Sequence, residues 1–169
     1  MGVPGFFKWL LEKERKNKNL IRNSINKKIK YLMLDTNCLL HPCINHVIDK
    51  IKDKGGKYLG AGDYGAVYLL GGRAVKVTTD EIEIEHALKL VGKKTKYFVH
   101  IHDVKEMNPK LGVITMDIMA PHRGEVPEEF LDALEKEAKK LGIDPDELDI
   151  RPDNFMEDPS TGKIKMTDV

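Results

Sequence analysis

Residues 58–77 read YLGAGDYGAVYLLGGRAVKV and contain the pattern G-x-G-x-x-G-x-V, a pair of glycines and a lysine in a second apolar run. The three-glycine spacing also occurs in dinucleotide-binding turns, where the third glycine opens a helix. Here Gly65 is followed by Ala-Val-Tyr-Leu-Leu, which is typical of a strand, and Gly71-Gly72 is typical of a hairpin turn. The stretch therefore predicts a β-hairpin with the three glycines at its bend and with Lys76 on the next strand.

The glycines of this stretch and its lysine are suited to binding phosphate groups. Because glycine has no Cβ atom, the backbone at Gly60, Gly62 and Gly65 can approach a phosphate chain and direct N–H groups toward it. The combination resembles the glycine-rich loop and strand-three lysine of the protein kinase superfamily, which binds ATP with Mg²⁺. The resemblance implies that these glycines, Val67 and Lys76 bind the nucleotide. An ordinary glycine-rich hairpin with a solvated lysine is the alternative.

A helix is predicted to follow the lysine strand. Residues 79–81, Thr-Asp-Glu, are typical of a helix start. The expected apolar stripe of this helix is Ile84, Ala87, Leu88 and Val91. The kinase resemblance implies that the helix carries a glutamate, which orients the lysine toward the α- and β-phosphates. Glu85 lies beside the stripe and is the favoured partner of Lys76, with Glu81 and Glu83 as competing candidates.

Two further strands are predicted, at residues 97–106 and 112–119. The second contains Val-Ile-Thr-Met-Asp-Ile-Met, which resembles the last strand of the kinase N-lobe where it enters the hinge. By that resemblance Met116 takes the gatekeeper position, and the backbones of Asp117 and Met119 contact the adenine edge. An ordinary core strand explains the same residues nearly as well.

Residues 127–141 are the clearest helix of the sequence. Pro127 suits the first turn, two glutamates follow it, two lysines occupy the last turn, and Gly142 ends the helix. The predicted buried stripe is Phe130, Leu131, Leu134, Ala138 and Leu141. The helix carries no chemistry itself and leads into the next motif.

Residues 147–156 read ELDIRPDNFM and contain an aspartate and an asparagine five positions apart, as in D-x-x-x-x-N. This resembles the kinase catalytic loop. The resemblance implies that Asp149 accepts the proton of an attacking hydroxyl, that Asn154 ligates Mg²⁺, and that Arg151 contacts the transferring phosphate. Glu-Leu stands where the family has His-Arg before the aspartate, and this departure resembles small, atypical viral or bacterial kinases.

Residues 167–169, Thr-Asp-Val, resemble the Thr-Asp-Phe-Gly motif, which implies that Asp168 is a second Mg²⁺ ligand. A hairpin turn is predicted just before them, at residues 158–162. The kinase resemblance covers residues 57–169 and stops before an activation segment and the helices that bind a phosphoacceptor. We therefore expect phosphoryl transfer to a protein hydroxyl to be impaired.

The first third of the chain differs from the rest in charge. Residues 1–57 carry 13 Lys and Arg and 5 Asp and Glu, whereas residues 58–169 carry 15 and 22. Such a split predicts two parts, residues 1–54 and residues 55–169. A weak contact with nucleic acid is one role for the basic part, and a solvated charged helix is the alternative.

Two segments of the basic part, MGVPGFFKWL at residues 1–10 and LDTNCLLHPC at residues 34–43, closely resemble the opening of the Xrn-type 5′→3′ exoribonucleases. The resemblance implies that Asp35 is a Mg²⁺ ligand. One carboxylate cannot hold two hard cations for phosphodiester cleavage, so we expect an exonuclease-like fragment in which Asp35 is a remnant without nuclease activity. The elements predicted here are a helix over 4–16, a buried strand over 31–34 and a helix over 39–54.

Four residues at the start of the last helix or just before it have the types of zinc ligands, namely Cys38, His41, Cys43 and His46. On one helix, at ~100° per residue, they point in different directions and cannot converge on a single ion. We therefore expect buried thiols and partly exposed histidines in place of a zinc site.

The composition indicates a globular protein. The chain has 169 residues, of which 41% are hydrophobic and 33% charged. Two cysteines do not indicate a disulfide framework, and no apolar run is long enough to cross a membrane, so we expect a cytoplasmic protein with no membrane partner. The sequence indicates no oligomeric state.

These patterns predict an α+β fold, with a kinase-like N-lobe, a hinge, one long helix, a catalytic-loop hairpin and a basic helix-strand-helix appendage. The favoured function is binding of Mg²⁺-ATP, with a protein as the expected phosphoacceptor. An RNA-binding exoribonuclease fragment and an inactive fusion product are the alternatives.

Overall fold

The structure, a computed structural model, describes residues 36–108 and 110–169. The chain divides into two compact units, residues 1–43 and residues 44–169. The boundary predicted between residues 54 and 55 stays a prediction.

Helix α3 (Thr36–Asp53) runs across this division and confirms the helix expected over residues 39–54. Cys43 is exposed, so the expectation of a buried thiol is wrong there, whereas His46 is exposed as expected. The side chains of Cys38 and His41 lie outside the described residues. The same holds for the expected helix over 4–16, the strand over 31–34 and Asp35.

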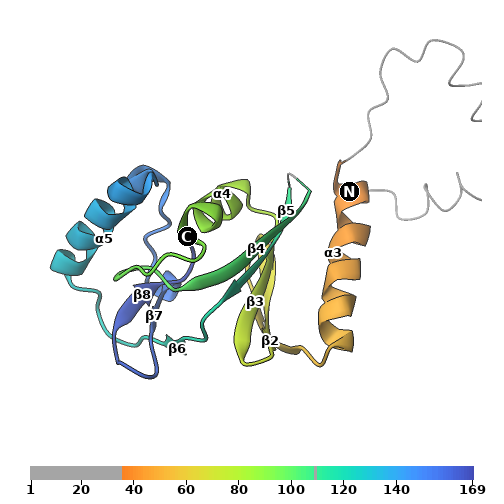
Figure 1. The fold of residues 1–169 in the computed structure, drawn as a ribbon, viewed down its shortest axis with the longest axis horizontal. Coiled ribbons are helices and arrows are strands. Elements are labelled where there is room, and N and C mark those ends of the chain that lie inside the picture. Colours follow the sequence, from red (N-terminus) through yellow and green to blue (C-terminus); the bar gives the residue numbers. More distant parts are fainter. Residues whose placement is uncertain (1–35, 109) are drawn as a thin grey trace, which may run out of the picture. The chain divides into compact units, whose positions relative to one another are not determined.

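The second unit has an α+β fold built on a five-stranded antiparallel sheet with the order β1-β2-β3-β5-β4 (Figure 1). The three strands expected at the start of the unit are confirmed. The fourth strand begins at Ile101 and not at residue 97, because residues 97–99 hydrogen bond to a different strand. The strands are β1 (Lys57–Ala61), β2 (Gly65–Leu70), β3 (Arg73–Thr78), β4 (Ile101–Asn108) and β5 (Leu111–Met116).

Glycines at two places are required by the geometry of the β2–β3 hairpin. Gly71 and Gly72 have φ angles of 58° and 76°, which favour glycine at both central positions of a two-residue turn. Gly65 pairs with Thr78 at the other end of the ladder, where a Cβ atom would clash with the backbone carbonyl of Val77. The hairpin register, and with it the position of Lys76, therefore follows from local sequence.

Helix α4 (Glu81–Leu90) covers one face of the sheet at β4 and β5. Its N-cap is Asp80, whose carboxylate accepts hydrogen bonds from the amides of Ile82 and Glu83. The expected stripe is partly wrong because Leu88 is 41% exposed. The buried positions are Glu83, Ile84, His86, Ala87 and Leu90.

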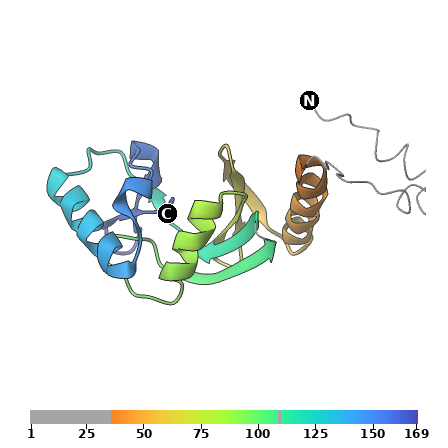
Figure 2. The same ribbon diagram turned by 90° about the horizontal axis from the view of Figure 1, so that it is seen from above.

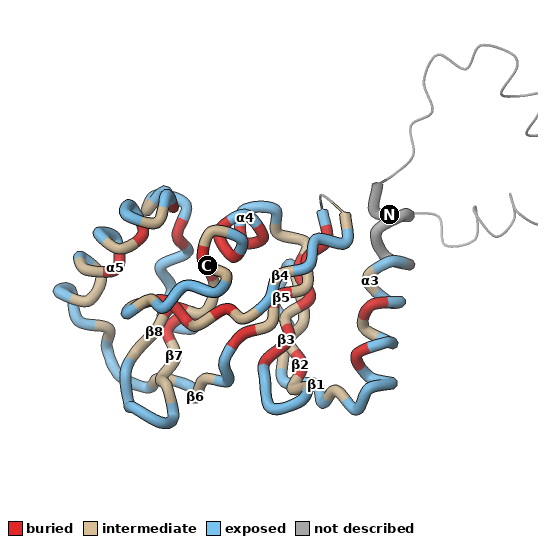
Figure 3. The backbone as a smooth tube through the Cα atoms, in the orientation of Figure 1, coloured by how far each residue is buried: buried red, intermediate tan, exposed pale blue. Residues whose placement is uncertain are grey.

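The second half of α3 packs on the opposite face of the sheet, where Val47 and Ile51 join Tyr68, Val75 and Val77 in one buried cluster. Side chains alternate between the two faces of a strand, so Lys76, between Val75 and Val77, faces the other way. Figure 2 shows the sheet between this helix and α4, and Figure 3 shows the buried positions of α3 on the side toward the sheet.

A short strand, β6 (Ala120–Pro121), leads from the sheet to helix α5 (Glu128–Leu141). Pro127 is the N-cap of α5, and Gly142 ends it in the left-handed conformation with φ of 77°. Leu134 and Ala138 are buried, and the other residues of the expected stripe are half-buried. The helix is followed by two 3₁₀ turns and two strands, namely η1 (Pro145–Glu147), η2 (Pro152–Asn154), β7 (Phe155–Glu157) and β8 (Ile164–Met166).

The β7–β8 hairpin is attached to the segment before β4. The amide of Val99 donates to the carbonyl of Met166, and the amide of Met166 donates to the carbonyl of Tyr97. One buried cluster continues from Ile101 and Ile114 of the large sheet to α5 and this hairpin. The packing therefore holds the loop before β7 at a set position against the sheet, and this is the arrangement that the kinase resemblance implies.

Within the part of the chain that the structure describes, no helix is both long enough and apolar enough to cross a membrane.

Candidate active site

A cleft with a volume of about 550 Å³ lies between the glycine-rich end of the sheet and the loops around β7 and β8. Small-molecule pockets typically have volumes of roughly 300–1,000 Å³. Every residue that the kinase resemblance implies to bind nucleotide, bind metal or act in catalysis lines this cleft, except Glu85. The residues so placed are Gly60, Gly62, Gly65, Val67, Lys76, Asp117, Met119, Asp149, Arg151, Asn154 and Asp168.

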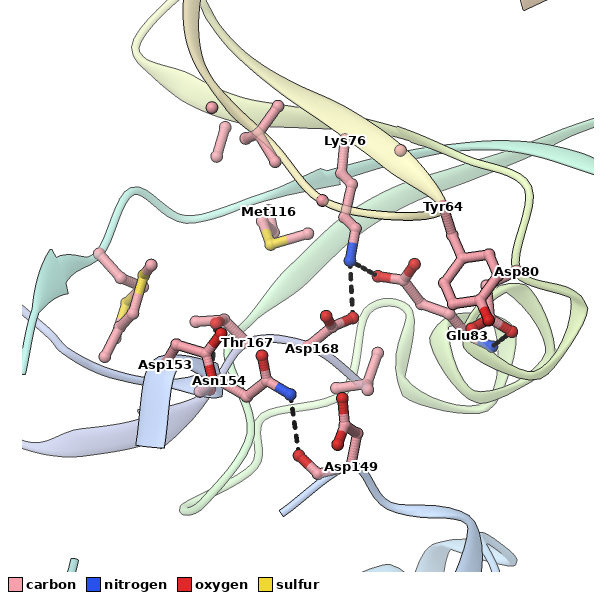
Figure 4. Close-up of a pocket in the computed structure, with 18 of the residues that line it drawn as sticks. Tyr64, Lys76, Asp80, Glu83, Met116, Asp149, Asp153, Asn154, Thr167 and Asp168 are labelled. Carbon is pink, nitrogen blue, oxygen red and sulfur yellow. Dashed lines mark hydrogen bonds and ion pairs between the residues drawn. The ribbon is translucent and has the colours of Figure 1, made fainter. Parts of the chain in front are cut away.

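Lys76 occupies the centre of the polar side of the cleft (Figure 4). Its Nζ lies 2.5 Å from Oε1 of Glu83 and 2.6 Å from Oδ1 of Asp168. Burial opposes the charged form of the lysine, but the two carboxylates outweigh it and raise the pKa of Lys76 above its ordinary value. The lysine is therefore a fixed cation that points into the cleft.

Glu83, and not Glu85, is the partner of Lys76, so the expected pairing is wrong. The side chain of Glu85 is 67% exposed and pairs with Lys89 one turn further along α4, at 2.7 Å. An i,i+4 Glu–Lys pair is typical of a solvent-facing helix surface. This spacing was present in the sequence and could have placed Glu85 on the outer face of the helix.

Burial raises the pKa of the Glu83 carboxyl group. Its side chain is 3% exposed, and desolvation raises the pKa of Glu83 to about 7, opposed by Lys76 and assisted by the charge of Asp168. The Glu83 carboxylate lies near two other charged groups, Lys76 and Asp168, and a change in either of them alters the charge of the cleft.

Two of the cleft glycines have open space where a side chain would begin. A Cβ atom placed on Gly60 or Gly62 would meet no atom of the protein within 4 Å, and neither glycine has a positive φ angle. Neither residue is required to be glycine by the fold, unlike Gly65. Their small size leaves the backbone of the cleft accessible to a ligand.

The loop before β7 places the side chains of Asp149, Asp153 and Asn154 opposite the lysine strand (Figure 4). The Nδ2 of Asn154 donates to the backbone carbonyl of Asp149 at 2.8 Å, which leaves its amide oxygen to face the cleft. Asp149 pairs with Arg151, whose guanidinium nitrogen lies 2.6 Å from Oδ2, and both side chains are about half exposed.

The oxygens of Asn154 and Asp168 fit Mg²⁺ bound together with phosphates. Mg²⁺ usually takes one or two protein oxygens and completes its shell with water and phosphate oxygens. Among the described residues, no group of three or more His, Cys, Asp and Glu side chains is gathered to hold a metal ion by itself. The donor set therefore suits a metal that arrives with its ligand more than a metal held by the protein alone.

The other side of the cleft is mainly apolar and contains the segment that the sequence predicts as a hinge. Met116, at the end of β5, is buried and lines the cleft. The amide of Asp117 donates to the carbonyl of His100, and its carboxylate lies 2.6 Å from Nε2 of His102. Met119 lines the cleft on the same side.

Comparisons with known proteins match both parts of the chain. The family model of the XRN 5′-3′ exonuclease N-terminus matches residues 1–58. Among solved structures, a variant of the Mycobacterium tuberculosis PknI kinase domain is 18% identical, with a TM-score of 0.47 over 66% of this chain. A structure of Rad53 in complex with AMP-PNP is 19% identical, with a TM-score of 0.48 over 66% of this chain.

The chain spans 57% of the length of that PknI chain and 36% of the Rad53 chain. No curated protein sequence matches it.

Proposed function

We propose that the second unit binds ATP as its Mg²⁺ complex in this cleft. The observation that carries the proposal is the position of Lys76 Nζ between Glu83 and Asp168, in a cleft that the open backbone at Gly60 and Gly62 also lines. A fixed cation beside backbone that a ligand can approach closely is an arrangement suited to a polyphosphate. The apolar slot beside Met116 then receives the base.

The charge of the cleft explains why the nucleotide comes with a metal. Both cationic side chains that line it, Lys76 and Arg151, are already paired with carboxylates. A free triphosphate would meet further carboxylates that line the cleft, such as Asp153. Asn154 and Asp168 would hold Mg²⁺, whose positive charge would neutralise the phosphates.

Phosphoryl transfer is the reaction that this proposal assigns to the loop before β7. A substrate hydroxyl attacks the γ-phosphorus, the bond from that phosphorus to the β,γ-bridging oxygen breaks, and ADP leaves with the electron pair. Asp149 accepts the hydroxyl proton, and Arg151 stands beside it to contact the transferred group. A hydroxyl-bearing protein side chain is the proposed acceptor.

Thermal unfolding in the presence of nucleotide tests the binding. We expect ATP with Mg²⁺ to raise the melting temperature more than ATP with EDTA, because a ligand that binds only the folded state stabilises it. The variant Lys76→Ala should lose this difference, and Lys105→Ala, which removes an exposed lysine of β4, should keep it. Equal shifts for the wild type and Lys76→Ala would overturn the proposal.

A second candidate function, RNA binding, concerns the first unit. The exonuclease N-terminus model matches residues 1–58, and this region carries the basic excess of the chain. RNA binding through phosphates should weaken steeply with salt. We expect single-stranded RNA to lose affinity when Lys13, Arg15, Lys16 and Lys18 are replaced by Gln. Unchanged RNA affinity in this variant would show that the basic segment does not bind RNA. If neither Mg²⁺-ATP nor RNA stabilises the chain, the result would point to an inactive fusion product.

A further inference from the structure

His86 is a buried polar residue of α4 that the proposed chemistry does not use. Its side chain is fully buried, and its Nε2 lies 3.2 Å from Oε2 of Glu147, the last residue of η1. Its Nδ1 has no hydrogen-bond partner within the described residues. Because a carboxylate only accepts hydrogen bonds, the Nε2–H of His86 donates to Glu147.

This contact lies next to the lysine pair on the same helix. His86 follows Glu83 by three residues, so both side chains leave α4 on neighbouring positions of one face. Glu83 contacts Lys76 of the sheet, and His86 contacts Glu147, two residues before Asp149. One helix turn is therefore bonded to the lysine strand and to the loop of the proposed catalytic base.

The burial of His86 makes this contact sensitive to the position of the helix. A buried imidazole without a hydrogen-bond partner is unfavourable, and Glu147 supplies the one partner that the described residues provide. A shift of α4 away from η1 would leave both ring nitrogens unsatisfied. The same shift would separate Glu83 from Lys76.

We propose that His86 and Glu147 are positioning residues, whose hydrogen bond holds α4 against the loop that carries Asp149 and so keeps Glu83 on Lys76. The proposal rests on the nucleotide site described above for its functional consequence. Its structural content, the attachment of α4 to η1, is independent of any ligand.

Hydrogen exchange measured by mass spectrometry tests this attachment in the full chain without ligand. Glu147→Ala should speed exchange in α4 by roughly two- to twelvefold, the factor expected from the loss of one hydrogen bond. Glu147→Gln keeps an accepting oxygen and should restore most of the protection. Asp146→Ala, which removes the exposed carboxylate next to it, is the matched control and should leave α4 unchanged. Equal exchange in Glu147→Ala and Asp146→Ala would overturn the proposal.

A double-mutant cycle on nucleotide affinity tests the consequence. In the wild-type background, Glu147→Ala should weaken Mg²⁺-ATP binding by roughly two- to twelvefold. In the background of Glu83→Gln, where Lys76 has already lost this partner, Glu147→Ala should have little further effect. Additive effects would show that Glu147 does not act through Glu83 and would overturn the positioning role. If the wild type binds no Mg²⁺-ATP, the proposed function fails, and the exchange measurement still decides whether His86 and Glu147 hold α4.

Discussion

The Nζ atom of Lys76 lies 2.6 Å from Oδ1 of Asp168, although 92 positions separate the two residues. Lys76 is on β3, and Asp168 follows β8, so this contact joins the large sheet to the hairpin after α5. The buried cluster that includes Ala74 on one side and Met166 on the other brings the two segments together. The contact therefore depends on the packing of the whole second unit.

The identity of the lysine partner gives the first prediction. At pH 8, where Glu83 with its pKa of about 7 is ionised, Glu83→Gln should lower the affinity for Mg²⁺-ATP about tenfold, because Lys76 loses one of its two charged anchors. Glu85→Gln is the matched control on the same helix and should leave the affinity unchanged. Isothermal titration calorimetry measures both. The same loss in both variants would contradict the assignment of Glu83.

The raised pKa of Glu83, about 7 against an ordinary value of 4.5, gives a prediction for pH dependence. Between these two pH values the folded protein retains a proton that the unfolded chain releases. The contribution of Glu83 to the free energy of unfolding is therefore fully present below pH 4.5. This contribution, on the order of 3 kcal/mol, is lost as the pH rises from 4.5 through about 7.

Urea unfolding from pH 4 to pH 8 measures this effect, with Glu83→Gln as the reference that cannot titrate. We expect the wild type to lose stability relative to Glu83→Gln across this range. Parallel stability curves for the two proteins would show that Glu83 titrates normally.

Substituting alanine for two of the cleft glycines should have two different effects, one on stability and one on nucleotide binding. Gly65→Ala should destabilise the fold by roughly 1–3 kcal/mol, because its Cβ atom meets the backbone of Val77. Gly62→Ala should leave stability nearly unchanged and weaken Mg²⁺-ATP binding, because its Cβ atom occupies space needed by the phosphates. Thermal unfolding and titration of each variant separate the two effects. Full nucleotide affinity in Gly62→Ala would argue that no ligand approaches this backbone.

The variant Asp149→Asn should separate nucleotide binding from phosphoryl transfer. Asp149→Asn should retain affinity for Mg²⁺-ATP, because its partner Arg151 is half exposed and such surface pairs contribute little. Any phosphoryl transfer by the wild type should fall by roughly 10²–10⁴-fold, the usual contribution of a general base. Transfer of radioactive γ-phosphate to a hydroxyl-bearing protein substrate measures this. Unchanged transfer in the variant would exclude Asp149 as the base.

Several elements followed from local sequence because their causes are local. The two positive-φ glycines of the β2–β3 turn, the Asp80 cap of α4 and the Gly142 end of α5 each depend on residues adjacent in the chain. The strands of the hairpin and the order of the motifs were predictable for the same reason. The start of β4 was not, because the extended segment before it pairs with β8, far away in sequence.

The sequence by itself determined which residue types stand at the glycine-rich bend, at the lysine strand and in the D-x-x-x-x-N loop. Only the tertiary structure decided that Glu83 and not Glu85 meets Lys76, and that His86 reaches Glu147. The physical reason is that a helix presents its residues in all directions, and packing of α4 on β4 and β5 selects the face that is buried. A pairing across 92 positions exists only once that packing has formed.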